Sequence, residues 1–340
     1  MTSDECSHNR HGHGMGVEEQ QNIPKRLYKY QAFTSLTLDL LVSDHVYYAD
    51  PRTFNDPLDT QPILKVDVAV EELQKILSRF VERRIKEEMS AAAKTIKYRG
   101  PKTMDHIERH SRRQAEQLIA EISYNATDPE YDSDDVLPVH LSRHIQVELL
   151  RQYDKGIVSL AERATCPLMW SHYGEQHHGV CIGYSVPKRT ASDIHKVRYG
   201  GSRLVEASKV AAMLAGDDGA RVQVDEAVLL RKAGSWRYER EWRLIGRRGL
   251  QNSPLELEEV IFGMRCKEPV KYAVVKALEG RAGKVRFYFM SEVPGTFRLK
   301  KYPLNDDGEL LLYFPRPNLS IYEVFAHHPL PLSSYVEQKC

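Results

Sequence analysis

A block of helical periodicity at residues 67–122 interrupts a chain whose other segments carry strand signals. Apolar residues recur at helical spacing in 71–89 and in 104–122, with charged residues on both sides of each apolar stripe. Gly100-Pro101 separates the two segments, and this pair breaks regular structure. We therefore predict two helices that form a hairpin inserted between strands.

The segments outside this block predict a sheet with a few covering helices. We expect strands at 27–30, 45–49, 156–162, 179–186, 195–200, 236–244, 257–263, 284–290 and 297–304. We expect helices at 35–41, 137–153, 167–173, 205–214 and 270–278, and an extended or helical segment at 222–230. The fold class is then α+β or α/β, as a single domain with a curved mixed sheet over 27–330 and a helical insertion at about 67–125. Residues 1–26 and 331–340 are predicted to be flexible tails.

Composition narrows the partners and the compartment. The 340 residues carry a net charge of +1, so no overall basic field points to a nucleic-acid partner. No run of about 18 apolar residues is present, which predicts that no segment spans a membrane. The start lacks an apolar core of the secretory type, and the five cysteines are scattered without CxxC spacing. These features predict a cytoplasmic protein with free thiols and without a structural zinc site.

The segment WRYEREWRLIG, residues 236–246, concentrates charge on what we predict to be a strand. Alternation then places Glu239 and Glu241 on one face, roughly 6–7 Å apart, with Arg237 and Arg243 beside them. Trp236, Tyr238 and Trp242 fall on the opposite face, which suits a core. Two interpretations follow: a salt-bridged strand face, or a carboxylate pair prepared for a polyhydroxyl or cationic substrate.

Two loops offer further candidate groups. In FNDPLD, Asn55, Asp56 and Asp59 can hold a metal ion or orient a sugar, although Asn-Asp-Pro also forms turns readily. His172, His177 and His178 do not have the spacing of an HExxH helix, so we predict no metal. His172 is then either a hydrogen-bonding residue at the edge of the core or a substrate contact. The arginines and lysines of 67–122 can contact phosphates, but the interleaved acidic residues favour a solvated helix face.

Four blocks, in order, resemble a large bacterial family of uncharacterised proteins. They are LYKY, FNDPLD, LMWSHYGEQHHGVCIGY and WRYEREWRLIG, and they span residues 27–246. Members of that family typically show LYKYR, FNDPF, a WSHY block with a later histidine, and a YExEWR block. The resemblance implies a family and no chemistry, because the family has no known function.

A second similarity, to ADP-ribosyltransferases, does imply chemistry. A first strand with a basic residue and a late strand with Glu-x-Glu are similar to the arrangement that binds NAD in that family. The similarity implies NAD as substrate, Glu241 as the catalytic glutamate and Glu239 as the residue that activates or positions the acceptor. It further implies that Arg26 or Lys29 contacts NAD and that Tyr28, Tyr30 or Tyr173 stacks on nicotinamide. The chain lacks a Ser-Thr-Ser strand and has lysine where the family has arginine or histidine.

Three functions remain open from the sequence. The first is an NAD-dependent transferase of the ADP-ribosyl type, such as a toxin or phage-defence effector that modifies a protein or a nucleic acid. The second is a module that senses a nucleotide or a phage component without catalysis. The third is a metal-dependent nuclease or hydrolase that uses Asp56, Asp59 and Glu241.

Overall fold

The contacts between residues divide the chain into two compact units. The computed structural model describes residues 22–96, 100, 102–131, 135–153 and 155–304. We call residues 23–49, 156–195 and 235–304 the sheet unit, and residues 50–155 and 196–234 the helical unit. The tails expected at 1–26 and 331–340 lie outside the described residues, apart from 22–26. The domain bounds drawn from the sequence stay a prediction.

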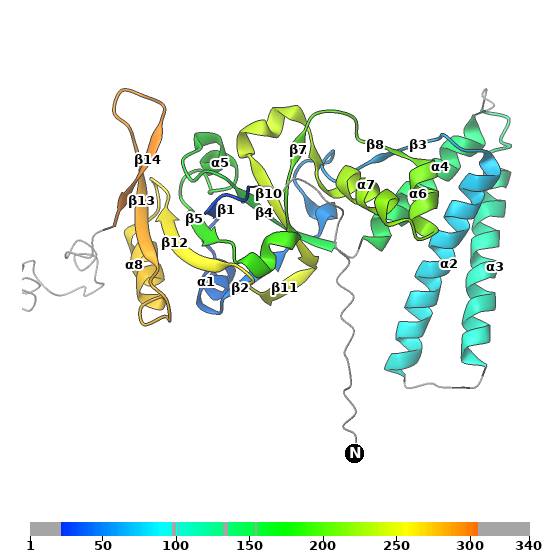
Figure 1. Cartoon of the computed structure of the whole chain (residues 1–340), viewed down its shortest axis with the longest axis horizontal. Coiled ribbons are helices and arrows are strands. Elements are labelled where there is room, and N and C mark those ends of the chain that lie inside the picture. Colours follow the sequence, from blue (N-terminus) through cyan, green and yellow to red (C-terminus); the bar gives the residue numbers. More distant parts are fainter. Residues whose placement is uncertain (1–21, 97–99, 101, 132–134, 154, 305–340) are drawn as a thin grey trace, which may run out of the picture. The chain divides into compact units, whose positions relative to one another are not determined.

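The sheet unit is built on an eight-stranded sheet with the order β14-β13-β12-β5-β1-β4-β10-β6 (Figure 1). Its strands are β1 (Leu27–Gln31), β4 (Lys155–Ala161), β5 (Val180–Ser185), β6 (Ile194–Lys196), β10 (Glu241–Arg247), β12 (Glu256–Phe262), β13 (Arg286–Glu292) and β14 (Leu299–Pro303). Its helices are α1 (Ser35–Val42), α5 (Pro167–His172) and α8 (Glu268–Ala277), with short 3-10 helices at Lys188–Asp193 and Gly234–Glu239. A small second sheet pairs β2 (His45–Tyr48) with β11 (Gly249–Asn252).

The large sheet is mixed, as the sequence predicts. β1 is antiparallel to both β4 and β5, whereas β12 and β13 are parallel. The connection from β12 to β13 therefore needs a crossover, and α8 provides it. The expectation of an α+β fold with a mixed sheet is confirmed.

The two faces of this sheet differ in what covers them. Leu27, Ile182 and Trp242 belong to a large apolar core that includes residues of α1 and α8. Tyr30 lies three positions after Leu27, and Cys181 lies one position before Ile182, so both point to the opposite side and belong to a smaller core with α5. Because side chains alternate along a strand, β1 and β5 each contribute to both cores. We call the two sides the α1/α8 face and the α5 face.

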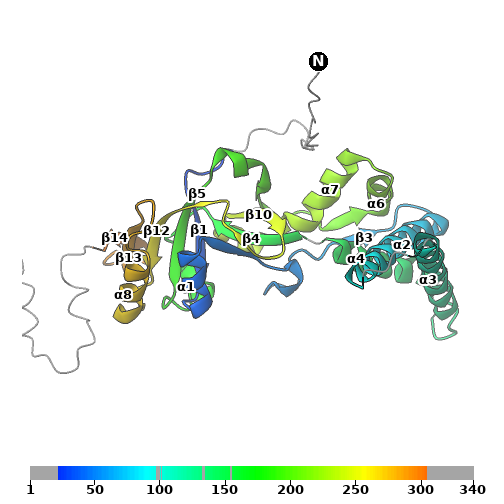
Figure 2. The ribbon, with the colours of Figure 1, turned by 90° about the horizontal axis from the view of Figure 1, so that it is seen from below.

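The helical unit contains most of the helical residues that the structure describes. Its helices are α2 (Val70–Thr95), α3 (Thr103–Asn125), α4 (Val136–Gln152), α6 (Ala207–Leu214) and α7 (Asp218–Leu229), with a 3-10 turn at Pro51–Thr53. Two small parallel sheets pair β3 (Ile63–Lys65) with β8 (Leu204–Glu206), and β7 (Arg198–Tyr199) with β9 (Arg231–Lys232). Both views show α2 and α3 running side by side (Figures 1 and 2).

The apolar stripes seen in the sequence explain how these helices pack. Leu73, Leu77 and Phe80 of α2 are fully buried, and so are Leu141 and Ile145 of α4. The helices expected at 71–89, 104–122 and 137–153 therefore form where the periodicity places them. The ambiguous segment at 222–230 is helical, because Asp217 caps α7 by accepting a hydrogen bond from the Ala220 backbone amide. In the described part of the chain, no helix combines the length and the apolar character needed to cross a membrane.

Candidate functional site

The α5 face of the sheet unit carries a buried ion pair on β10. Glu241 and Arg243 alternate with Trp242 and Leu244, which belong to the α1/α8 core. Glu241 is 3 % exposed and Arg243 is fully buried. The guanidinium donates from Nε to Oε1 at 2.9 Å and from Nη2 to Oε2 at 3.2 Å. Both oxygens of Glu241 are thus engaged by a rigid, charged fork.

The residues before β10 are helical, so the expected strand at 236–244 is wrong in its first half. Gly234–Glu239 forms a 3-10 helix, and β10 starts only at Glu241. Arg240, between them, has a φ of 47°, in the left-handed region that few residues other than glycine adopt. This turn breaks the alternation on which the prediction depended. Glu239 and Glu241 are therefore not successive positions on one strand face.

Glu239 is buried beside an aromatic cluster. Its exposed fraction is 4 %, and its Oε1 accepts a hydrogen bond of 2.8 Å from the Tyr173 hydroxyl. His172 lies next to Trp236 and Tyr238, with ring centroids 6.3 and 6.4 Å away. We call His172, Tyr173, Trp236 and Tyr238 the aromatic cluster. It joins the end of α5 to the 3-10 helix, so the WSHY and WRYEREWR segments meet in space.

A cavity of 480 Å³ lies beside this cluster. We call it the arginine cavity; its walls are Arg163, Thr165, Cys166, Pro167, Arg237, Tyr238 and Arg240. The three arginines are exposed, and Tyr238 is half-buried. Arginine offers a planar set of donors that matches phosphate and carboxylate groups. The cavity therefore suits an anionic ligand that also carries a ring.

Tyr30 stabilises the segment of Arg163 and Cys166 that forms one wall of the arginine cavity. Its hydroxyl donates to the backbone carbonyl of Arg163 at 2.6 Å and accepts from the Cys166 amide at 3.4 Å. Its ring packs edge-on against Trp170, with centroids 5.2 Å apart. Burial raises the pKa of Tyr30, which keeps the hydroxyl protonated as a donor. In this structure Tyr30 positions the cavity wall, and its ring is buried in the core.

Arg26 and Tyr28 belong to a different polar cluster on the α5 face. Both contact Glu259, which is fully buried on β12; the Arg26 Nη1 atom donates to it at 3.0 Å. Lys301 on β14 donates to the other oxygen of Glu259 at 2.5 Å. Burial, followed by the Glu259 charge, raises the pKa of Tyr28. Gly183 makes room for this cluster, because a Cβ there would lie 2.6 Å from the Cγ atom of Glu259.

Lys29 shares a face with the apolar core. Its pairing with Ile182 places it on the α1/α8 side of β1. Burial lowers its pKa, while the charge of Glu241 opposes that shift. Lys29 is thus electrostatically linked to Glu241, although the two residues point from opposite faces of their strands.

Asn55 and Asp56 lie in the helical unit, in the loop after the 3-10 turn Pro51–Thr53. Asp56 accepts a hydrogen bond of 2.8 Å from the Leu58 amide, which is the local pattern of an Asx turn. Asp59, farther along the loop, is buried and pairs with Lys232 at 3.4 Å. The loop thus has a structural role within its own unit.

The histidines of the WSHYGEQHHG segment take separate positions. His172 is exposed in the aromatic cluster, whereas His177 stacks on Trp170 with centroids 6.0 Å apart. Across the described residues, no three side chains of the His, Cys, Asp and Glu types are grouped as a metal ion requires. His172 belongs to the aromatic cluster, beside Tyr238, which lines the arginine cavity.

Several residues of the site were not among the sequence candidates. Arg163 and Cys166 follow β4 in a loop without a motif, and only the fold brings them to Arg237 and Arg240. The sequence shows that arginines are concentrated in WRYEREWR. We predicted this segment as a strand with one charged face, so we did not predict a cavity there. The signal that could have revealed it is the Gly-Ser pair at 234–235, a common turn former.

Residues 169–244 match the model of a protein family of unknown function, DUF2971. The match contains α5 from Met169 onward, the 3-10 helix at Gly234–Glu239 and the first part of β10. It therefore includes the aromatic cluster, Glu239, Glu241 and two of the three cavity arginines. Searches of curated proteins and of solved structures found no match. The likeness to a family of unknown function is thus shown for this segment, and a likeness to ADP-ribosyltransferases is not shown.

Proposed function

We propose that this protein binds a dinucleotide of the NAD type in the arginine cavity and cleaves its nicotinamide–ribose bond. One observation carries the proposal: three arginines and Tyr238 line a single cavity, and the buried carboxylate of Glu239 lies between two of these lining residues in the chain. Arginines suit the diphosphate, and aromatic rings suit the base or the nicotinamide ring. The volume of 480 Å³ lies within the range of about 300–1,000 Å³ common for small-molecule sites.

The reaction needs a negative charge near the ribose. The bond between C1′ and the nicotinamide nitrogen breaks, and its electron pair leaves with nicotinamide as a neutral molecule. The ribose is left as an oxocarbenium-like cation. A nucleophile attacks this cation at C1′, and the nucleophile then loses a proton. A fixed carboxylate beside C1′ stabilises the cation as it forms.

The geometry favours Glu239 over Glu241 for this role. Both oxygens of Glu241 are bound by the buried Arg243 guanidinium. Glu239 stands between Tyr238 and Arg240, which line the cavity, and its Oε1 atom is held by the Tyr173 hydroxyl. We assign Glu239 to the stabilisation of the oxocarbenium-like cation. Glu241 then has a structural role, in which its ion pair with Arg243 stabilises β10.

The test compares NAD binding with nicotinamide release. We expect Arg237→Gln with Arg240→Gln to weaken NAD binding, measured by calorimetry, by tenfold or more on the basis of about 1.5–3 kcal/mol for each charged hydrogen bond. Glu239→Gln should keep binding and lower the rate of release by about 100-fold or more. Arg189→Gln, at an exposed arginine of the same unit outside the cavity, is the matched control. Wild-type protein that neither binds NAD nor releases nicotinamide would refute the proposal.

A second candidate is a nucleotide sensor without catalysis. The burial of both glutamates favours it, because each is already satisfied by a protein donor. NAD binding without nicotinamide release, with any protein or nucleic-acid acceptor supplied, would decide for the sensor. Transfer of label from NAD to an acceptor would support an effector of the toxin or phage-defence type.

A further inference from the structure

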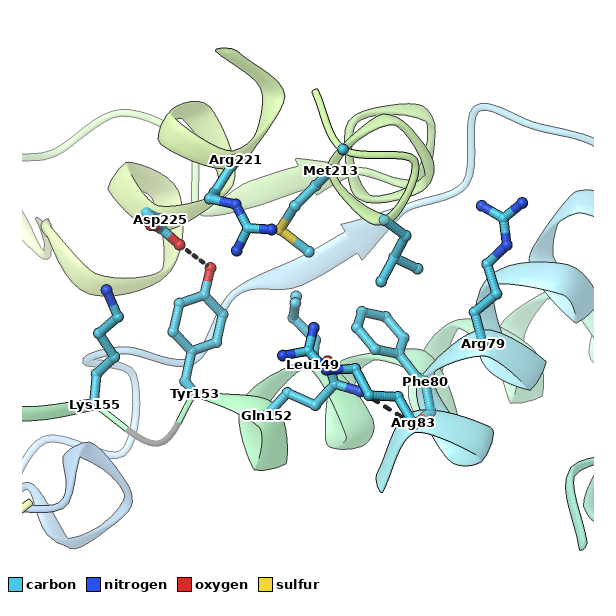
Figure 3. A pocket seen from close by; sticks show the side chains of 12 residues that line it. Arg79, Phe80, Arg83, Leu149, Gln152, Tyr153, Lys155, Met213, Arg221 and Asp225 are labelled. Atoms are coloured by element: carbon cyan, nitrogen blue, oxygen red, sulfur yellow. Dashed lines mark hydrogen bonds between the residues drawn. The ribbon is translucent and has the colours of Figure 1, made fainter. Parts of the chain in front are cut away.

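A second cavity, of 320 Å³, lies wholly inside the helical unit (Figure 3). We call it the helical-unit cavity; α2, α4, α6 and α7 surround it. Its floor is apolar and includes Phe80, Leu149 and Met213. Its rim is basic and includes Arg79, Arg83 and Arg221. The combination of an apolar floor with a cationic rim is not a feature of a uniformly solvated helix face.

The positive charge at this rim is poorly compensated. Within the residues that the structure describes, Arg79 and Arg221 form no ion pair. Arg83 pairs with Glu87 at 3.0 Å, but both side chains are more than half exposed, so water screens the pair. Figure 3 shows Arg83 and Arg221 extending into the space between the helices, with Lys155 at its edge.

The one carboxylate in the cavity is already engaged. Asp225 accepts a hydrogen bond of 2.6 Å from the Tyr153 hydroxyl, drawn as a dashed line in Figure 3. The cavity lining thus contains four cationic side chains and one carboxylate, which is already bonded. An anion entering the cavity gains these contacts without displacing an existing partner of Arg79 or Arg221.

The floor is preformed. Phe80 is fully buried, and Leu149 is 1 % exposed. The Gln152 side chain donates to the Phe80 carbonyl at 3.1 Å, which fixes α4 against α2 beneath the cavity. A site that is rigid before binding loses less entropy when a ligand enters.

We propose that the helical-unit cavity binds a nucleoside diphosphate, with the phosphates on Arg83 and Arg221 and the ring system over the apolar floor. Guanidinium groups match phosphate oxygens in pairs, and the floor offers a dry surface to a base. The volume reaches the lower end of the range for small-molecule sites, about 300 Å³, which suits a mononucleotide. This site belongs to a different unit from the arginine cavity and does not depend on the function proposed for it.

The experiment measures ADP binding to the full chain by calorimetry and locates it by hydrogen exchange. We expect ADP to protect amides in 79–83, 149–153 and 213–225. The double variant Arg83→Gln with Arg221→Gln should bind ADP at least about tenfold more weakly, since each lost charged hydrogen bond accounts for about a tenfold change or more. Arg109→Gln with Arg113→Gln, at two exposed arginines of α3 outside the cavity, should bind as the wild type does.

Three results would overturn the proposal. The first is an ADP affinity that does not change in the Arg83/Arg221 variant. The second is amide protection by ADP only in 163–167 and 235–240, because that would place the nucleotide in the arginine cavity. The third is that inorganic pyrophosphate binds as tightly as ADP, because the apolar floor would then contribute nothing to nucleotide binding. Adenosine separates the contributions further, because we expect it to bind more weakly than ADP. The variant residues are exposed, and circular dichroism checks that both double variants are folded.

Discussion

At the scale of single residues, the ion pair of Glu241 and Arg243 is a buried, bidentate contact on β10. Arg243 is fully buried, so removal of the Glu241 charge leaves a cation without its bidentate partner. We expect Glu241→Gln to lower the free energy of unfolding by about 3–5 kcal/mol. Urea denaturation followed by tryptophan fluorescence measures this loss.

A surface pair in the same segment gives the matched control for that prediction. Arg240 lies 3.6 Å from Glu162 and is 45 % exposed, so Arg240→Gln should cost less than about 1 kcal/mol. Similar small losses in both variants would mean that water reaches Glu241, and its assignment to structural support would fail.

We expect His177 to make the stability of the sheet unit depend on pH. Burial, then the charges of Arg265 and His178, lowers its pKa below the usual 6.5. Its Nδ1 atom is buried without a hydrogen-bond partner, which fits a neutral ring. Below pH 6.5 the unfolded chain binds a proton at this residue more readily than the folded chain does, so stability falls as the pH falls.

We therefore expect the free energy of unfolding to decrease from neutral pH toward the folded-state pKa of His177. His177→Gln should show a smaller decrease over the same range, because the titrating group is gone. The exposed neighbour His178, replaced by glutamine, is the matched control. An identical pH dependence in wild type and His177→Gln would exclude this residue as the cause.

At the scale of elements, the turn between α5 and β5 depends on a glycine from elsewhere in the chain. Glu175, Gln176 and His177 all have positive φ, so three successive residues adopt left-handed backbone. The His177 carbonyl accepts from the Arg265 amide at 2.9 Å, just beyond the end of β12. A Cβ on Gly263 would lie 2.1 Å from this carbonyl oxygen, far inside the closest approach of a non-bonded carbon and oxygen.

We expect Gly263→Ala to destabilise the protein by about 1–3 kcal/mol, because the turn must shift to accept the methyl group. The matched control is Gly234→Ala, where the added Cβ meets no atom within 4 Å. Thermal unfolding compares the two. Equal melting temperatures would show that the turn moves freely and that the left-handed residues are not held by β12.

Periodicity predicted the long elements and failed at the short ones. The stripe of α2 and the aromatic pattern of β1 each extend over enough residues to show a period. β7 and β9 have two residues each, so they have no period to detect. The 3-10 helix at Gly234–Glu239 has an alternating pattern of aromatic and charged residues, which is typical of a strand. Arg240, which follows it, has a left-handed backbone conformation that its residue type does not predict.

The candidate site was predictable in part for the same reason. Glu239, Tyr173 and His172 were identified from their motifs, and the fold brings them together around Tyr238. Arg163 was not, because its place at the cavity depends on the pairing of β4 with its neighbours. The pairing of Arg26 and Tyr28 with Glu259 also depends on long-range register, which a single sequence does not contain.

At the scale of the whole molecule, the chain passes repeatedly between two units, and its three tryptophans report on one of them. Trp170, Trp236 and Trp242 all belong to the sheet unit. The helical unit depends on α2, whose Leu73, Leu77 and Phe80 are completely buried against its neighbours. Far-ultraviolet circular dichroism can therefore follow the helical unit while tryptophan fluorescence follows the sheet unit.

We expect deletion of residues 70–125, bridged by a short flexible linker, to leave a cooperative fluorescence transition while the remaining helical unit loses its helix signal. The sheet unit keeps its own two cores, whereas α4 and α6 lose the face that α2 covers. A shorter deletion of 90–108 removes the far end of the hairpin but keeps the buried part of α2 from Leu73 to Ile85, and it should preserve both signals. Loss of the fluorescence transition in the long deletion, with its retention in the short one, would show that the sheet unit does not fold without α2.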